Sequence, residues 1–439
     1  MSKNMGFKDS PLGLIPDDWE YTKLSNITNI KRGASPRPID NPIWFADEGR
    51  GWVRINDVTR SNGHLYSTEQ YLSPLGVTKS VPVNVGQLIM SICATIGEPA
   101  IVEIDVCIHD GFVVFDQYEK YLTTKFLYHF LRFYTPNFQN YGQTGTQANL
   151  NTTIVGATPI ALPPLKEQEK IAEILDKVDS SIELTEALIK KLKQIKAGLL
   201  QDLLTRGLDE KGELRNPDTH PEQFKDSPLG KIPINWEVVE LKSLLSSPIK
   251  DFGSFSMTNL LDFQDSGIPF LKTEAIYDYG LDIKHITFIS EKIHQLLPQS
   301  IVYKNDILLT KIVAIGRVCL YDGSLGICNS NAASAKIRIS SSLASKDFIA
   351  YFLRSDFAKR QYLNSVISTP PRINLNQINQ LNIITPPLKE QVKIVKILDT
   401  QEKAIEKEEQ YLKKLKQKKQ GLMQDLLTGK VRVNHLFYN

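Results

Sequence analysis

The residues best suited to chemistry in the N-terminal half are basic and amide side chains in two polar loops. Arg and Lys can hydrogen-bond to guanine, and Asn and Gln to adenine, while Lys, Arg, Ser and Thr can hold phosphates. One loop carries Lys31, Arg32 and Arg37 beside a glycine and prolines, and the other runs from Gly142 to Gln147. Loops this small and polar can enter a groove of DNA, so we interpret them as candidate nucleic-acid contacts.

The C-terminal half holds a comparable set of polar residues. A loop runs from Ser368 to Arg372, and basic residues stand at the ends of strand-like stretches. A solvated surface role is the alternative for each of these side chains. The predicted DNA-binding residues of both halves are Lys31, Arg32, Arg37, Arg54, Gln143, Thr144, Thr146, Gln147, Asn149, Lys272, Lys311, Arg317, Thr369, Arg372, Asn374 and Asn376.

Catalytic motifs are missing from the sequence. There is no Gly-x-x-x-x-Gly-Lys-Ser/Thr loop and no dinucleotide-type glycine loop after a strand. Residues 41–44 (NPIW) lack the second proline of the Asn-Pro-Pro-Tyr motif of adenine methyltransferases, and residues 282–284 (DIK) lack the upstream Pro-Asp of a nuclease site. The seven histidines show no zinc-like pairing. The chain is therefore interpreted as a binding protein without catalytic or metal-binding residues of its own.

The elements that must position these loops occur twice. Residues 163–205 align without a gap on 386–428, with 27 identities in 43 positions, and both copies begin with PPLKEQ. The leader FKDSPLGLIPDDWE (7–20) recurs as FKDSPLGKIPINWE (224–237). A period this long excludes a solenoid and indicates duplication of a large unit.

Two diverged bodies lie between the repeated segments. They share little sequence identity, but each has strand-like runs followed by a helical stretch, as at 121–133 and 346–363. This order predicts an α+β fold for each body. The predicted divisions are a leader (1–24), the first body (25–162), a central helix (163–206), a linker with the repeated leader (207–241), the second body (242–385), a C-terminal helix (386–429) and a tail (430–439).

Each conserved segment is predicted to be one long helix of roughly 60 Å. Pro164 and Pro387 suit a first helical position, and apolar residues recur in steps close to four and three, from Ile171 to Leu199 and from Ile394 to Leu422. A narrow apolar stripe needs a partner helix, and the other copy is the nearest one. We therefore expect an antiparallel intramolecular coiled coil with pseudo-two-fold symmetry, with the lysine runs as its charged flanks. Gly198 and Gly421 mark either a close approach of the helices or a local bend.

Composition sets broad limits. The net charge is +3, apolar residues make up 41%, and the four cysteines have no Cys-x-x-Cys spacing. No run of about 18 apolar residues is present, so no membrane span is expected. These features predict a cytoplasmic protein with reduced thiols.

The combination of motifs resembles the specificity subunits of type I restriction–modification systems. The resemblance rests on the doubled Pro-Pro-Leu-x-Glu-Gln, the long helix ending in Leu-Leu-x-x-Gly, the leader Ser-Pro-Leu-Gly-x-Ile-Pro-x-x-Trp and the Gly-x-x-Pro in KRGASPRP (31–38), and it covers nearly the whole chain. It implies two target recognition domains, each recognising half of a split, asymmetric site in double-stranded DNA. It also implies two methyltransferase subunits for adenine N6 and motor–nuclease restriction subunits, which bind S-adenosylmethionine, ATP and Mg²⁺ in place of this chain.

The resemblance suggests that exposed helix faces and the leaders contact the partner subunits. The predicted partner-interface residues are Trp19, Trp236, Leu188, Leu203 and Leu426, although a Trp can also anchor a core. Three alternatives remain: a coiled-coil adaptor whose domains bind proteins, a single-chain enzyme with a degenerate methyltransferase site, and the specificity subunit of a related system that cuts beside its site. Only the adaptor would lack salt-dependent DNA binding.

Overall fold

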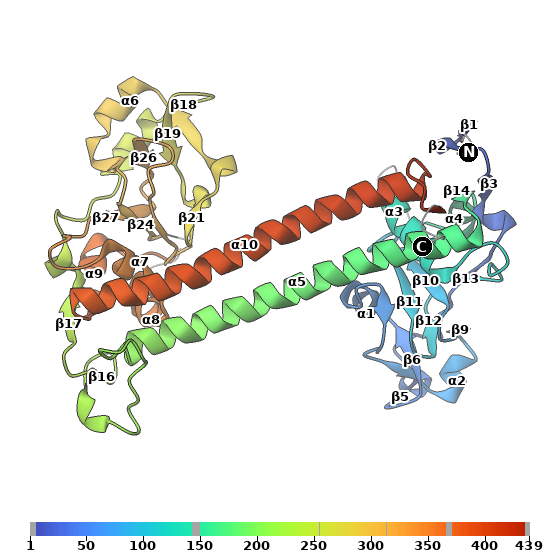
Figure 1. Cartoon of the computed structure of the whole chain (residues 1–439), viewed down its shortest axis with the longest axis horizontal. Coiled ribbons are helices and arrows are strands. Elements are labelled where there is room, and N and C mark those ends of the chain that lie inside the picture. Colours follow the sequence, from blue (N-terminus) through green and yellow to red (C-terminus); the bar gives the residue numbers. More distant parts are fainter. Residues whose placement is uncertain (1–5, 143–149, 254, 313, 366–370, 435–439) are drawn as a thin grey trace. The chain divides into compact units, whose positions relative to one another are not determined.

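The computed structural model describes residues 6–142, 150–253, 255–312, 314–365 and 371–434 (Figure 1). The chain divides into two compact units, of which unit 1 is Met1–Ala187 with Gln410–Asn439 and unit 2 is Leu188–Glu409. Two long helices, α5 (Leu165–Thr205) and α10 (Leu388–Leu427), each contribute one part to each unit. Each unit therefore consists of one body and one antiparallel pair of helical segments.

The body of unit 1 contains two five-stranded sheets. One has the order β4-β13-β10-β11-β7 and the other β5-β8-β6-β12-β9. Their bounds are β4 (Asn29–Arg32), β13 (Phe112–Asp116), β10 (Leu88–Ser91), β11 (Pro99–Val102), β7 (His64–Leu65), β5 (Phe45–Ala46), β8 (Tyr71–Leu72), β6 (Arg50–Val53), β12 (Val106–Ile108) and β9 (Val81–Val83). Two-stranded pairs β1 (Phe7–Ser10) with β2 (Gly13–Pro16) and β3 (Glu20–Lys23) with β14 (Pro159–Leu162) complete the unit.

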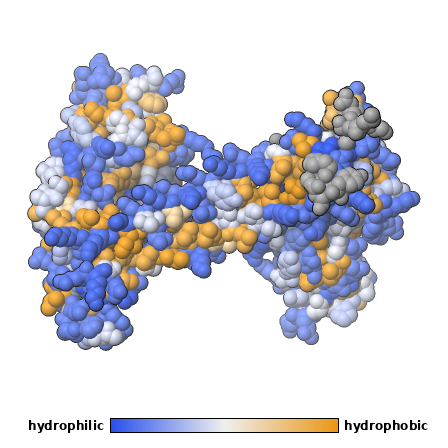
Figure 2. Space-filling model, in the orientation of Figure 1, coloured by the Kyte–Doolittle hydropathy of each residue, from blue (hydrophilic) through white to orange (hydrophobic). Residues whose placement is uncertain are grey.

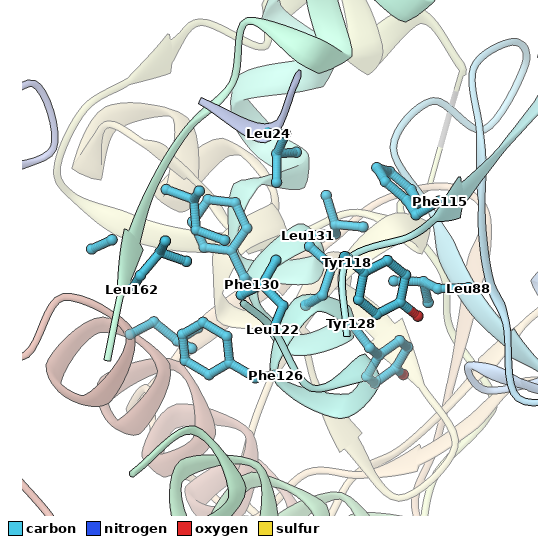
Figure 3. Packing of buried hydrophobic residues seen from close by; sticks show 14 of the residues in the cluster. Leu24, Leu88, Phe115, Tyr118, Leu122, Phe126, Tyr128, Phe130, Leu131 and Leu162 are labelled. Carbon is cyan, nitrogen blue, oxygen red and sulfur yellow. The ribbon is translucent and has the colours of Figure 1, made fainter. Parts of the chain in front are cut away.

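Strand β10 is buried on both faces, which explains why its first three residues, 88–90, are all apolar. Leu88 and Met90 pack with the body helices and the long helices, whereas Ile89 packs against the second sheet. Figure 3 shows the inner cluster, where Phe115 from β13 meets aromatic residues of helix α3 (Thr124–Gly142). The same cluster includes Ile171 of α5. The body and its helical segments therefore share one core.

Unit 2 has a similar arrangement, with a three-stranded and a five-stranded sheet. Its sheets have the orders β25-β24-β27 and β18-β22-β19-β26-β23, with the pairs β15-β16, β17-β28 and β20-β21. The bounds are β25 (Val318–Leu320), β24 (Ile307–Thr310), β27 (Ser334–Ile337), β18 (Phe263–Gln264), β22 (Thr287–Ile289), β19 (Ile268–Leu271), β26 (Cys328–Ser330), β23 (Ile301–Val302), β15 (Phe224–Lys225), β16 (Ile232–Pro233), β17 (Glu237–Glu240), β28 (Asn382–Thr385), β20 (Ile276–Tyr277) and β21 (Gly280–Leu281).

The register of the central strands is the same in the two bodies. Leu88 pairs with Phe115 in unit 1, and Ile307 pairs with Ile337 in unit 2. The remaining helices of unit 1 are α1 (Ile55–Arg60), α2 (Pro74–Val77) and α4 (Thr152–Gly156), and those of unit 2 are α6 (Glu291–Leu296), α7 (Lys346–Arg354), α8 (Asp356–Asn364) and α9 (Leu375–Asn379). The expected α+β fold with two long helices is confirmed.

Cross-helix ion pairs repeat in the two helical segments. In unit 1, Lys416 Nζ lies 2.7 Å from Glu186 Oε1, and Lys419 pairs with Asp179. In unit 2, Lys193 Nζ lies 2.6 Å from Glu409 Oε1, and Lys196 pairs with Glu402. Each pair lies 223 positions from its counterpart, as the sequence repeat requires. The lysine runs are therefore charged flanks of the helical pair, as predicted.

The two helical glycines make no close packing contact. A Cβ atom added to Gly198 or Gly421 would have no non-local heavy atom within 4 Å, and both helices continue through the glycine. The expectation of a close backbone approach is wrong at both positions. None of the helices in the described ranges combines the length and apolar content needed to cross a bilayer.

The repeated PPLKEQ segment fixes the start of each long helix to its body. Gln168 Oε1 accepts from Thr123 N at 3.0 Å, and its Nε2 donates to the Pro163 carbonyl at 2.9 Å. Gln391 makes the matching bonds to Ser345 N and the Pro386 carbonyl, each at 2.8 Å. The identical residues in the two copies thus perform the same structural task.

A buried glutamate beside this glutamine holds the leader against the helix. In unit 1, Glu167 accepts from Trp19 Nε1 at 3.1 Å and from Arg432, near the end of the chain, at 2.7 Å. In unit 2, Glu390 accepts from Trp236 Nε1 at 3.0 Å and from Arg215 at 2.7 Å. The segment that follows one long helix therefore closes the start of the other.

Candidate nucleic-acid interface

The first basic loop of unit 1 leaves the edge strand β4. This strand pairs with β13 so that Arg32 lies opposite Val113 and Lys31 opposite Val114. Gly33 follows, and a Cβ there would lie 2.1 Å from the His109 carbonyl oxygen, so only glycine permits this approach. The pairing brings the loop next to the turn that precedes β13.

Asp110 in that turn organises the basic side chains. Its backbone carbonyl accepts from Arg32 Nε at 2.8 Å, and its carboxylate accepts from Ser35 Oγ at 2.6 Å and from Arg37 Nη2 at 3.3 Å. The Ser35 hydrogen bond is the main reason why the pKa of Asp110 is lowered. The side chain of Arg37 is 69% exposed, so its guanidinium remains accessible to DNA.

Arg54 lies beside the same turn. Its guanidinium is 5.0 Å from the centroid of the buried Trp52 ring, which meets His109 edge-on at 6.3 Å. Burial lowers the pKa of His109, and the nearby charge of Arg54 lowers it further. The imidazole is therefore neutral near pH 7, and the positive charge of this surface comes from arginine and lysine.

The amide-rich loop 143–149 lies outside the described residues, and so do its predicted contacts Gln143, Thr144, Thr146, Gln147 and Asn149. The described chain resumes at Leu150, whose N donates to the Ile92 carbonyl at 3.1 Å. Cys93, the next residue along, lies with its Sγ 3.7 Å from the Gly111 carbonyl. The described chain therefore resumes near the Asp110 turn.

In unit 2 the corresponding turn is centred on Asn331. Its Nδ2 donates to Thr273 Oγ1 at 3.2 Å, and Thr273 adjoins Lys272, whose Nζ lies 3.9 Å from the centroid of the Phe263 ring. Lys311 N donates to the Ala333 carbonyl at 2.8 Å, and Ile312 forms a bridge with Arg372. Backbone contacts thus place Lys272 and Lys311 beside this turn, with Arg372 bridged to the neighbouring Ile312.

Three predicted residues have other roles in the structure. The side chain of Lys311 is only 12% exposed and pairs with Asp251 at 3.2 Å, which limits its access to DNA. Arg317 faces the β20-β21 pair instead of the Asn331 turn, with its guanidinium 4.7 Å from the Tyr277 ring centroid. Asn374 Oδ1 accepts from Gln377 N at 2.9 Å as the cap of α9.

The cap corrects the assignment of Asn374. A bidentate contact with adenine needs its amide oxygen, which the helix cap already occupies. Asn151 caps α4 of unit 1 in the same way, with Ile154 N donating at 2.9 Å, so these two asparagines are the structural counterparts. Asn376 lies exposed within α9 and stays a prediction. Thr369 lies outside the described residues.

Four of the predicted partner-interface residues are buried within the chain. Trp19 and Trp236 are fully buried by the glutamate contacts described above, and Leu203 and Leu426 are buried in the cores of units 2 and 1. Their side chains are therefore unavailable to another subunit. Leu188 on α5 is 43% exposed and stays a prediction. Figure 2 shows hydrophobic residues along the long helices on the face in view.

Asp110 and Asn331 are the organising residues that the sequence reasoning missed. Each follows a short strand and lies close in space, but not in sequence, to one of the basic residues named above. No local sequence motif therefore identified either residue. Among the described residues, no group of three or more His, Cys, Asp or Glu side chains could hold a metal ion.

Comparisons with known proteins agree with this arrangement. The model of the type I restriction modification DNA specificity domain matches residues 16–194 and 233–417. The putative type I restriction enzyme MjaX specificity subunit of Methanocaldococcus jannaschii is 26% identical over 98% of both chains. The type I restriction enzyme EcoBI specificity subunit of Escherichia coli is 25% identical over 87% of this chain and 79% of its own length.

Solved structures share the fold. A chain from a study of complex assembly and conformational transition in a type I restriction–modification system superposes with a TM-score of 0.56 at 18% identity, over 95% of this chain and 99% of that one. The type I S subunit from M. genitalium gives 0.55 at 13% identity, over 93% and 96%. Because the family model matches both halves, the chain belongs to the family of type I restriction–modification DNA specificity proteins.

Proposed function

We propose that this chain is the DNA-recognition subunit of a type I restriction–modification complex. Each body recognises one half of a bipartite, asymmetric site in double-stranded DNA. Two methyltransferase subunits then methylate adenine N6, and restriction subunits cut, with S-adenosylmethionine, ATP and Mg²⁺ bound on those partners. The main support is the repeated placement of a basic turn, at Asp110 and at Asn331, on bodies that share one helical frame.

Exposed charge supports DNA contact at the Asp110 turn. Arg37 has most of its guanidinium in solvent, and Lys31 is 51% exposed while paired with Asp116 at 3.1 Å. Both could exchange these weak surface pairs for phosphates. In the second body Arg372 is exposed next to the bridge with Ile312.

The decisive experiment maps N6-methyladenine across the genome, by long-read sequencing, in cells carrying the cognate methyltransferase subunit. The cells are compared with and without this chain. The expected result is a split motif with a fixed gap, methylated only when the chain is present. If the two proteins associate but no chain-dependent methylation occurs, the proposal fails, and the adaptor hypothesis takes its place.

An exchange of bodies tests the division of labour. Replacing residues 25–162 with the body of a related subunit should change one half-site and leave the other unchanged. A change in both half-sites would contradict independent recognition by the two bodies.

Point variants then test the interface. Arg37→Ala should weaken binding of the purified complex to its motif and reduce the dependence of affinity on salt. Arg60→Ala is the matched control because Arg60 is equally exposed, at 68%, but pairs with Glu69 outside this turn. Equal losses in the two variants would contradict the assigned interface.

A further experiment tests whether the helical pair sets the distance between the two half-sites. Matched insertions of one heptad, between Ala187 and Leu188 and between Glu409 and Gln410, fall at exposed positions where the two units meet in sequence. Seven residues lengthen a helix by about 10 Å, which corresponds to roughly three base pairs. The methylated motif should gain a longer gap, and an unchanged gap would exclude this role.

A further inference from the structure

A groove in unit 2 holds an aromatic residue between two cations. Its volume is about 820 Å³, and it lies between the helical segments and the β20-β21 hairpin of the body. Tyr279 stands in the turn of this hairpin. Lys196 Nζ lies 3.4 Å from the centroid of its ring, and the Arg354 guanidinium carbon lies 4.0 Å from it. Both distances are those of cation–π contacts.

The hairpin is held here against its backbone preference. Tyr279 has φ = 74°, a left-handed conformation that bulky side chains rarely adopt. Such a conformation persists only where surrounding contacts impose it. The Val318 carbonyl accepts from Tyr279 N at 3.4 Å and from Arg354 Nε at 3.0 Å, so the hairpin and helix α7 share one anchor.

Both cations are fixed from the helical side. Lys196 on α5 pairs with Glu402 on α10, and their side chains are 10% and 18% exposed. Arg354 also lies 5.5 Å from the Tyr351 ring, whose hydroxyl donates to Asp399 of α10 at 2.7 Å. The ring of Tyr279 is therefore contacted by Lys196 of α5 and by Arg354 of the body, and Glu402 of α10 holds Lys196 in place.

Unit 1 has the same cations and acids without the aromatic ring. Lys419 pairs with Asp179, and Arg132 lies 3.8 Å from that carboxylate, in a groove of about 330 Å³. The loop residue that lines this groove is Asn62, which also has a positive φ of 49°. Among the described residues, Asn62 therefore lines the groove of unit 1 where the ring of Tyr279 lies in unit 2.

The hairpin also touches a predicted DNA contact. The Arg317 guanidinium stacks 4.7 Å from the Tyr277 ring centroid, and its Nη1 donates to the Ile276 carbonyl at 3.5 Å. Tyr277 and Tyr279 belong to one four-residue connection. Tyr277, which Arg317 contacts, is two residues from Tyr279. We therefore expect a change in the position of Tyr279 to alter the position of Arg317.

We propose that Tyr279 is a positioning residue that fixes the angle of the second body on the helical pair, and thereby the gap at which the second half-site is recognised. This inference rests on the proposed function. Removing the ring should leave the bases recognised by the second body unchanged. It should relax the selection for the length of the gap.

The test uses the full chain assembled with its methyltransferase partner, on the motif found by methylome mapping. Duplexes carry the native gap or a gap one base pair shorter or longer, and initial methylation rates are compared. Tyr279→Asn copies the residue of unit 1 and tolerates the left-handed conformation, so the chain should fold. Tyr279→Phe keeps the ring and serves as the control.

Wild type and Tyr279→Phe should share one preference for the native gap, and Tyr279→Asn should reduce that preference about five- to tenfold. If Tyr279 only stabilised the fold, Tyr279→Asn would lower the methylation rates on all three duplexes by the same factor. An unchanged ratio between the rate on the native gap and the rates on the altered gaps would overturn the inference. Thermal unfolding of each complex identifies any loss of folded protein. If methylation by the wild type shows no chain-dependent motif, the proposed function has failed. If the motif is present but Tyr279→Asn leaves the ratio of the rates unaltered, only the positioning role is refuted.

Discussion

Residues at the start of the long helices make matching contacts in the two units, whereas the outer layers of the two bodies differ in chemistry. Glu167 and Glu390 bind a tryptophan and an arginine in the same way. Farther from the helices, unit 1 buries Val114 opposite Ile89, and unit 2 buries Lys336 opposite Leu308. Contacts with the shared helical frame restrict which residues a position accepts, and this restriction weakens with distance from the frame.

The outer layer of unit 2 satisfies its polar groups internally. Asn329 is fully buried and donates from Nδ2 to Ser300 Oγ at 2.7 Å, while His294 Nδ1 lies 2.6 Å from its Oδ1. Lys336 Nζ donates to the Gln299 carbonyl at 2.6 Å. The matching cluster in unit 1 consists of apolar side chains, including Val53. Two chemically different layers thus complete the same fold.

The largest effect is expected where the two units are most alike. Glu390→Gln should leave Arg215 buried without its counter-charge and cost about 3–5 kcal/mol of unfolding free energy. Glu167→Gln should cost less, because Arg432 keeps its ion pair with Asp18. Urea denaturation of each variant measures the loss. Glu173→Gln, on the exposed face of α5, is the control and should change little. A loss in Glu390→Gln no larger than that in Glu173→Gln would contradict this assignment.

A pH-dependent difference should distinguish the outer layers. Burial lowers the pKa of Lys336 to about 8, with a further contribution from Arg338. Between pH 8 and 10 the unfolded chain keeps this proton and the folded chain loses it, so stability rises with pH by roughly 2 kcal/mol. Urea denaturation at pH 8, 9 and 10 should show this rise in wild type and not in Lys336→Met. A rise that survives the substitution would assign it to another group.

A smaller pH effect of the same direction, at lower pH, is expected in unit 1. Burial lowers the pKa of His129, although its bond to Asp176, at 2.8 Å, opposes the shift. Below pH 6.5 the unfolded histidine binds a proton that the folded one does not, so stability falls as the pH is lowered. Tyr351, bonded to Asp399 in unit 2, does not titrate in this range.

Thermal unfolding between pH 7 and 5 measures the effect, and His129→Gln should flatten the profile. Lys125, Asp179 and Lys419 also face this histidine or its carboxylate partner. Burial would raise the pKa of Asp176, but bonds from His129 and Lys125 outweigh it and lower the value to about 2. Its own titration therefore falls below the interval. A His129→Gln profile as steep as that of wild type would refute this assignment.

The smallest effects are expected at the exposed cross-helix pairs. Lys193→Gln and Lys416→Gln each remove a partner from a carboxylate that is about half exposed. Each should cost less than about 1 kcal/mol at low salt, and screening should remove the difference in 1 M salt. Denaturation at both salt concentrations checks this, and a loss that persists in high salt would indicate packing contacts of the lysine stems.

The repeated segments could be predicted well because their evidence is local. Apolar spacing identifies α5 and α10, and the ion pairs follow from residues 223 positions apart. The role of Trp19 could not be found in this way, because its partner Arg432 lies more than 400 residues away in sequence. Asn374 was misassigned because the side chain that suits adenine also suits a helix cap.

The way the chain closes unit 1 has a consequence for its synthesis. Met423, Leu426, Leu427 and Val433 belong to the same core as Ile15 and Phe126, and Arg432 holds Asp18 and Glu167. The ribosome therefore completes the continuous stretch Leu188–Glu409 of unit 2 before the first body has its full core. For much of translation the N-terminal body therefore exposes apolar surface that chaperones can bind. Nascent chains stalled before residue 410 should then show a protected second body and a protease-sensitive first one.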